Sequence, residues 1–151
     1  MPRRLSPWLI VLSLLVVVLV AVQAIPYGRH HSNPPVIAEP FWDSPETRDA
    51  VKNACFDCHS NETNWPWYSQ IAPASWLMQH DVDAARAKLN FSEWRRGYDA
   101  DEIEAALKRR MPLKFYLTLN PHARLGPSDR IYLMRGLTRT IELSEKQIGG
   151  R

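Results

Sequence analysis

The chain has 151 residues, about enough for one domain, with 19 Lys and Arg against 16 Asp and Glu. Arg3 and Arg4 are the only charged residues among the first 26, so the remainder carries 17 basic and 16 acidic side chains. A balance so close to neutral gives no support for a nucleic-acid-binding protein, although the isoelectric point is about 9.0.

The chain begins with an apolar segment, residues 5–25. Its interruptions are Ser6, Pro7, Ser13 and Gln23. A helix of these 21 residues would be roughly 32 Å long at about 1.5 Å per residue, which matches a hydrocarbon core about 30 Å thick. We therefore predict one N-terminal transmembrane helix, with residues 1–25 as a membrane anchor.

Arg3 and Arg4 precede the apolar segment and predict its orientation. Positive charges stay on the cytoplasmic side, so the rest of the chain should face the periplasm as the outer part of a single-pass protein of the bacterial inner membrane. A signal peptide cleaved after Val22-Gln23-Ala24 is the alternative, and it predicts the same compartment.

Residues 26–43 contain Pro26, Pro34, Pro35 and Pro40 and are predicted to form an extended tether. Residues 44–151 would then form the folded domain. Its first helix should begin with Ser44 as N-cap and Pro45 at the first helical position. The helix continues through apolar positions into Cys55.

The most informative motif is the pentapeptide Cys55-Phe56-Asp57-Cys58-His59. Two thiols three positions apart, followed at once by an imidazole, have the attachment spacing of a c-type haem. Each sulfur adds to one vinyl group of the porphyrin, and His59 supplies a neutral nitrogen to the iron. A local disulfide, a thioredoxin-like redox pair and a structural zinc site are the alternatives.

The rest of the domain has helical patterns and no convincing period of two. Residues 60–74 are polar, aromatic and interrupted by proline, and are predicted to be a loop. Helices are predicted at 76–89, at 99–110 with Asp99 and Glu102 as a capping pair, and from Pro127 onward. One stripe of the first of these helices is predicted to carry Leu77, His80, Ala84 and, at its end, Lys88. The apolar side of the last helix is predicted to carry Ile131, Met134, Leu137 and Ile141. The predicted fold is all-α, a cytochrome c-like helical domain around a covalent haem.

An electron carrier also needs a sixth ligand for the iron. We predict Met111, because it follows a helix end and precedes Pro112, which makes the backbone rigid. His80, on the stripe of the second helix, is the alternative ligand. Met78, His122 and Met134 are weaker candidates: the last most simply packs in the core, and His122 lies in an exposed loop.

Several short segments of the chain are distinctive in combination. They are Cys55-Phe-Asp-Cys-His59-Ser-Asn-Glu-Thr63, Trp65-Pro-Trp-Tyr68, Ile71-Ala-Pro73, Ser75-Trp-Leu77, Leu89-Asn-Phe-Ser-Glu-Trp94 and Met111-Pro112. Over residues 25–145 the chain resembles the bacterial haem-binding domain proteins, which are small, N-terminally anchored c-type haem proteins. The resemblance implies haem attachment at Cys55 and Cys58 with His59 as a ligand. It leaves both Met111 and His80 as candidates for the sixth position.

The function predicted from these features is that of a membrane-anchored monohaem c-type cytochrome that transfers single electrons on the periplasmic side. Its cofactor would be covalently attached haem c, and its partners would be redox proteins of a respiratory or periplasmic chain, with no nucleic acid. The protein is then a carrier rather than an enzyme. The alternatives are a haem peroxidase-like enzyme with an open distal site, and a haem-based redox or gas sensor.

Overall fold

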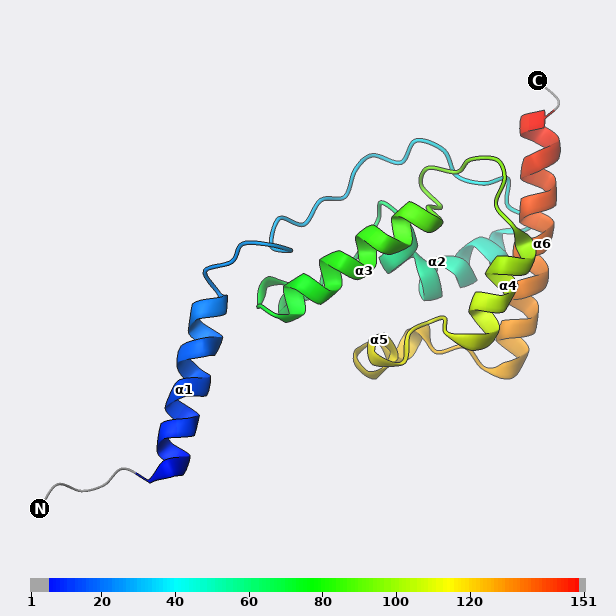
Figure 1. The fold of residues 1–151 in the computed structure, drawn as a ribbon. Helices are drawn as coiled ribbons and strands as arrows, with labels where there is room; N and C mark the ends of the chain where they lie inside the picture. Colours follow the sequence, from blue (N-terminus) through cyan, green and yellow to red (C-terminus); the bar gives the residue numbers. More distant parts are fainter. Residues whose placement is uncertain (1–5, 150–151) are drawn as a thin grey trace, which may run out of the picture. The chain divides into compact units, whose positions relative to one another are not determined.

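A computed structural model describes residues 6–149 of the chain. Its α-helices are α1 (Pro7–Val22), α2 (Pro45–His59), α3 (Ala74–Lys88), α4 (Ala100–Arg109), α5 (Lys114–Leu119) and α6 (Pro127–Gly149) (Figure 1). Two 3₁₀ turns, η1 (Trp67–Gln70) and η2 (Pro121–Ala123), lie between them. Residues 6–149 contain no strand, only one isolated parallel bridge between Ala38 and Glu93. The helical class predicted from the sequence is therefore correct.

The predicted transmembrane helix is wrong. Helix α1 has 16 residues, or about 24 Å at 1.5 Å per residue, and is shorter than a hydrocarbon core of about 30 Å. Within residues 6–149, no helix combines the length and the apolar character that a membrane crossing requires. The predicted segment also included Gln23, which ends the helix. Its side-chain amide accepts from the backbone N of Ala72 at 3.1 Å and donates to the backbone O of Ala72 at 2.8 Å.

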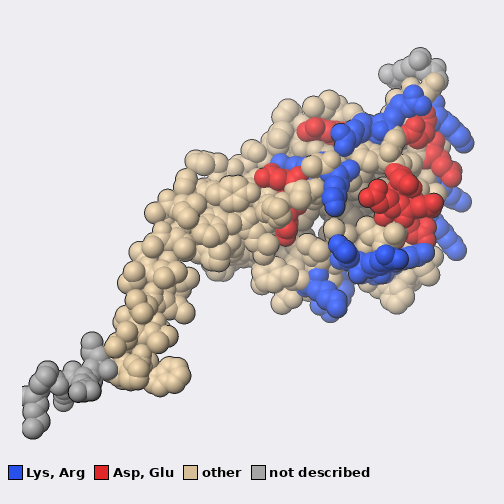
Figure 2. Space-filling model, viewed as in Figure 1, with Lys and Arg blue, Asp and Glu red and all other residues tan. Residues whose placement is uncertain are grey.

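Helix α1 consists of apolar residues except for Ser13. It carries no charged side chain, and its surface in Figure 2 is uniformly tan. None of its side chains is buried. Arg3 and Arg4, which the orientation argument used, lie outside the described residues.

The chain divides into two compact units, and α3 contributes to both. The first unit contains residues up to 32 together with 65–81. In it, His31 stacks on Trp65 with ring centroids 4.2 Å apart. The His31 imidazole also contacts the backbone O of Ser69 and the side chain of Gln70, at 3.1 and 3.0 Å. The domain boundaries drawn from the sequence stay predictions.

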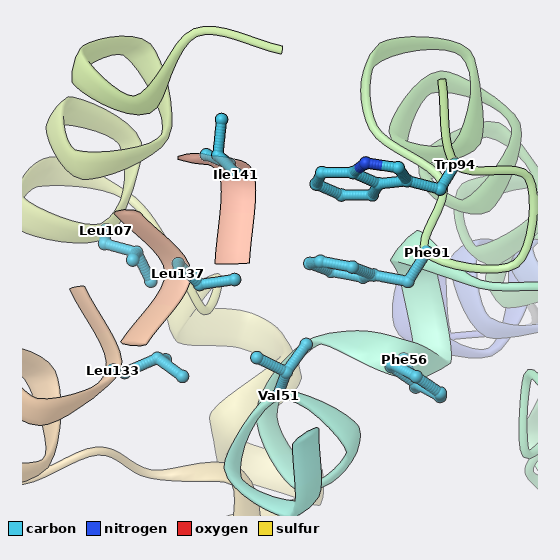
Figure 3. Packing of buried hydrophobic residues seen from close by; sticks show 8 residues of the cluster. All are labelled: Val51, Phe56, Phe91, Trp94, Leu107, Leu133, Leu137 and Ile141. Atoms are coloured by element: carbon cyan, nitrogen blue, oxygen red, sulfur yellow. The ribbon is translucent and has the colours of Figure 1, made fainter. Parts of the chain in front are cut away.

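The second unit contains residues 33–64 and the chain from 82 onward, and it holds the hydrophobic core. The core consists of Val51, Phe56, Phe91, Trp94, Leu107, Leu133, Leu137 and Ile141 (Figure 3). Phe91 stacks between Phe56 and Trp94, with centroid distances of 5.7 and 5.9 Å. Aliphatic side chains of α4 and α6 face these rings in Figure 3. Burial of this apolar surface is the main stabilising term for the unit.

Helix α6 packs against α2 through small residues. A Cβ added at Gly136 would lie 2.3 Å from the hydroxyl oxygen of Thr47, so only glycine permits this approach. Ile131, predicted to face the core, is instead 49% exposed. The buried face of α6 continues through Gly136, Thr140 and Ser144, whose small or polar side chains hide the true stripe from a hydropathy pattern.

The predicted helix starts are confirmed at two caps. The hydroxyl of Ser44 accepts from the backbone N of Thr47 at 3.1 Å, with Pro45 as the first residue of α2. The carboxylate of Asp99 accepts from the backbone N atoms of Asp101 and Glu102 at the start of α4. Helix α5 was missed, because a six-residue helix is too short to give a periodic signal.

Candidate functional site

The last five residues of α2 are the pentapeptide itself, Cys55 to His59. Positions three and four apart share one face of a helix, so Cys55, Cys58 and His59 lie on the same side of α2. Both cysteines are thiols rather than a disulfide, and both are partly buried. Cys55 packs against the hydrophobic core. Burial, with a smaller contribution from neighbouring Cys58, raises the pKa of the Cys55 thiol to about 12, so this sulfur is protonated at neutral pH.

The imidazole of His59 has a defined tautomer. Its Nδ1 lies 3.0 Å from the backbone O of Leu89, and since a carbonyl oxygen can only accept, Nδ1 carries the proton. Burial lowers the pKa of His59, and the hydrogen bond to Leu89 opposes that shift only in part. The ring is therefore neutral with its lone pair on Nε2, the state in which a histidine binds a metal.

The residues after the pentapeptide fix that imidazole through a buried polar network. The backbone N of Phe91 donates to the O of His59 at 2.8 Å. The backbone N of Asn61 donates to the hydroxyl of Ser92 at 2.9 Å, and the amide of Asn90 donates to the side-chain O of Asn61 at 2.9 Å. These three polar side chains are 1–5% exposed. The loop that carries the Leu89 carbonyl is thus held against the end of α2.

Arg86, in the part of α3 that belongs to the second unit, also contributes hydrogen bonds to this network. Its guanidinium donates to the backbone O of Ser60 at 2.8 Å and to the hydroxyl of Thr63 at 3.0 Å. The Ser60 hydroxyl in turn donates to the O of Phe56 at 2.8 Å. The sequence interpretation missed Asn61, Asn90 and Arg86. Asn61 and Asn90 lie in segments that carry the family resemblance, whereas Arg86 lies outside all of them, so no local signal in the sequence marked it.

Met111 lies between the end of α4 and the start of α5, and it packs against the same hydrophobic core as Cys55. Its backbone is held on both sides. The N donates to the O of Ala106 at 2.9 Å, and the O accepts from the guanidinium of Arg130 at 2.7 Å. Pro112 follows and is buried. The predicted rigidity of the Met111 backbone therefore has a physical basis.

Helix α5, which begins two residues after Pro112, is joined to the pentapeptide. The hydroxyl of Tyr116 donates to the carboxylate of Asp57 at 2.6 Å. The other carboxylate oxygen of Asp57 accepts from the backbone N of Asn64 at 3.1 Å. The segment that carries Met111 and the helix that carries the two cysteines are thus linked through a side chain between Cys55 and Cys58.

The remaining ligand candidates have other surroundings. His80 is exposed on the part of α3 that belongs to the first unit, and Met78, in the same part, is partly buried. The stripe predicted for this helix is wrong: Leu77, His80 and Ala84 are exposed, whereas Val82 and Ala85 are buried. His122 is exposed, and Met134 packs against the core, both as predicted from the sequence.

The donor set of the second unit fits a haem. Among residues 6–149, no three side chains of His, Cys, Asp and Glu converge to hold a metal ion by themselves, so the zinc alternative finds no site there. A haem needs less from the protein, because the porphyrin supplies four of the iron ligands and the protein supplies axial ones. A neutral histidine with a fixed tautomer, two thiols on its helix face and a thioether on the same core provide that set.

Comparison with known proteins supports this chemistry. The model of a family described as a haem-binding domain matches residues 17–139, most of the chain. No curated protein and no solved structure gives a significant match.

Proposed function

This chain belongs to the haem-binding domain family, and from that membership we propose that it is a monohaem c-type cytochrome that transfers single electrons. Cys55 and Cys58 would hold the porphyrin through thioether bonds, and His59 would bind the iron on one side. When bound, the haem supplies a one-electron redox centre.

The hydrogen bond from His59 to Leu89 carries this proposal. It directs the Nδ1–H of His59 at the backbone O of Leu89 and leaves Nε2 as the only ring nitrogen with a lone pair. A partner on the far nitrogen of this kind orients an axial histidine and increases its basicity. Because Cys55 and Cys58 share the face of α2 from which this imidazole projects, one planar cofactor can reach all three side chains.

Met111 is our proposed sixth ligand. Its backbone bonds to Ala106 and Arg130 and its place on the same core as Cys55 support this choice. A thioether opposite an imidazole raises the reduction potential relative to two imidazoles. A ligand whose backbone is held on both sides keeps the coordination unchanged between oxidation states, as an electron carrier requires.

We further propose the periplasmic side as the compartment, because c-type haem is attached on that side in bacteria. The partners would be redox proteins of a respiratory or periplasmic chain. No observation in the described residues favours the peroxidase or the sensor alternative.

Expression together with a c-type haem attachment system tests the proposal. We expect the reduced alkaline pyridine spectrum of the purified protein to be that of a haem whose two vinyl groups are saturated. Cys55→Ala and Cys58→Ala should each shift that spectrum toward one free vinyl group. Haem that acidified acetone removes completely from the wild-type protein would refute covalent attachment.

A further inference from the structure

Exposed basic side chains gather where α4 ends and α5 begins. Between Ala105 and Ser128 the sequence has five basic residues and no acidic one. Lys108 pairs with Glu104 one turn earlier on α4. Arg109, Arg110 and Lys114 are exposed and form no ion pair within the described residues. In Figure 2, Lys and Arg side chains lie around the end of α4, whereas the surface of α5 is largely tan.

Exposed apolar side chains lie among these cations. Leu113 is 36% exposed, Phe115 61% and Leu119 48%. Isolated exposed apolar residues are ordinary, but a group of them edged by charge is typical of protein interaction sites. We call Arg109, Arg110, Leu113, Lys114, Phe115 and Leu119 the α4–α5 surface.

The α4–α5 surface is distinctive because basic and acidic side chains balance over the described residues as a whole. Without Arg3, Arg4 and Arg151, which lie outside the described residues, the chain has 16 basic and 16 acidic side chains. The local positive charge is therefore a matter of distribution and not of a basic protein.

Helix stabilisation explains only part of the cluster. Arg109 lies in the last turn of α4, where a cation interacts favourably with the helix dipole. Lys114 is the first residue of α5, where the same dipole opposes a cation. Three uncompensated cations within six residues also repel one another. An anionic partner would relieve both costs.

The α4–α5 surface also lies beside the proposed redox site. In the sequence, Met111 follows Arg110 and lies two residues before Leu113. The hydroxyl of Tyr116 in α5 donates to the carboxylate of Asp57 in the pentapeptide. A protein bound here would be next to the segment that supplies the proposed sixth ligand. Electron transfer requires a short distance between the two redox centres, and this position would provide it.

We propose that the α4–α5 surface is the docking site for a redox protein whose own docking face is acidic around an apolar contact. This inference rests on the proposed function and deepens it by naming the partner chemistry and its place. Opposite charges steer such an encounter, and the apolar residues hold the complex once it has formed.

The first experiment uses small electron acceptors of opposite charge on the reduced holoprotein. Hexacyanoferrate(III) takes one electron from the protein and becomes hexacyanoferrate(II), and a tricationic cobalt(III) phenanthroline complex becomes cobalt(II) in the same way. If electrons leave the protein through the positively charged α4–α5 surface, the rate of electron transfer to hexacyanoferrate should fall as the salt concentration rises. The rate of electron transfer to the cobalt complex should then increase with salt.

Charge reversal with a matched control separates local from net charge. Arg109→Glu/Arg110→Glu should lower the low-salt rate with hexacyanoferrate by about tenfold or more and reverse its salt dependence. Arg135→Glu/Arg139→Glu changes the net charge equally at exposed positions of α6 and should have a much smaller effect. Equal effects of the two double variants, or no effect of either, would overturn the proposal.

An acidic blue copper protein serves as a protein acceptor and tests the apolar contact. Phe115→Ser should weaken saturation with this acceptor several-fold and leave the hexacyanoferrate rate unchanged. Sedimentation with vesicles containing anionic phosphatidylglycerol distinguishes the other occupant: binding that depends on Arg109 and Arg110 there, with no saturation by the copper protein, would replace the protein partner by a membrane. Covalent haem with no dependence on this surface would refute this inference alone, whereas absence of covalent haem would refute the proposed function.

Discussion

The hydroxyl of Tyr116 donates to the carboxylate of Asp57 at 2.6 Å and joins the short helix α5 to the centre of the pentapeptide. Asp57 is one of the two residues between the cysteines, a position that attachment chemistry leaves unspecified. In this chain it holds the segment after Met111 against α2. The coordination of the iron is therefore expected to depend on a residue that binds neither iron nor porphyrin.

Tyr116→Phe should loosen this link without removing the ring. A hydrogen bond to a charged acceptor contributes about 1.5–3 kcal/mol, and since Tyr116 and Asp57 are only partly buried we expect a loss near the lower value. Urea unfolding of the holoprotein measures it. Tyr132→Phe, at an exposed tyrosine of α6, is the control and should cost little. Equal losses in the two variants would show that the Asp57 contact has no special role.

Met111→Ala should convert the oxidised iron from low-spin to high-spin and lower the reduction potential, because a thioether stabilises the reduced iron. Absorption spectroscopy and a redox titration measure both changes. His80→Ala is the matched variant and should leave the spectrum low-spin, since the side chain of His80 is exposed. The reverse pattern, with His80→Ala opening the iron, would establish bis-histidine coordination instead.

Asn90→Ala should destabilise the protein, because it leaves the buried side-chain oxygen of Asn61 without the donor it has in the network. Unsatisfied buried polar groups cost about 1–3 kcal/mol. Loss of this support should also weaken the bond from His59 to Leu89 and raise the potential, since the imidazole then donates less charge to the iron. An unchanged potential in a folded Asn90→Ala protein would separate the network from His59.

The chain without haem should lose stability as the pH falls below about 6.5, the ordinary pKa of histidine. Burial lowers the pKa of His59 in the folded state, so the unfolded chain takes up a proton at a higher pH than the folded one and acid favours unfolding. Urea unfolding at pH 7.5 and 5.5 measures the difference. His59→Gln should reduce this pH dependence, whereas His122→Gln, at an exposed position, should retain it.

The sequence predicted the parts of this protein that depend on local chemistry. The caps at Ser44 and Asp99 are satisfied by backbone groups two or three residues away, so their signals are complete within a few positions. The spacing of Cys55, Cys58 and His59 is equally local. Helices α2 and α4 begin at the caps that the sequence predicts, and the family assignment is confirmed.

The parts that were missed depend on tertiary contacts. Gln23 was counted within an apolar segment, but its amide pairs with the backbone of Ala72, 49 residues away. Asn61 and Asn90 bond across 29 residues of sequence. The stripe through His80 has the period of a buried helix face and is exposed. Periodicity marks a candidate face, whereas burial is decided by packing partners that are distant in the sequence.

Covalent attachment of one haem to Cys55 and Cys58 is the central claim, and mass spectrometry of a tryptic digest tests it most directly. Cleavage after Lys52 and Arg86 releases residues 53–86, which contain both cysteines of the chain. From holoprotein made with a haem attachment system, this peptide should carry the mass of one haem, retained under denaturing conditions and resistant to thiol alkylation. The same peptide recovered without haem and with both cysteines alkylated would contradict the account.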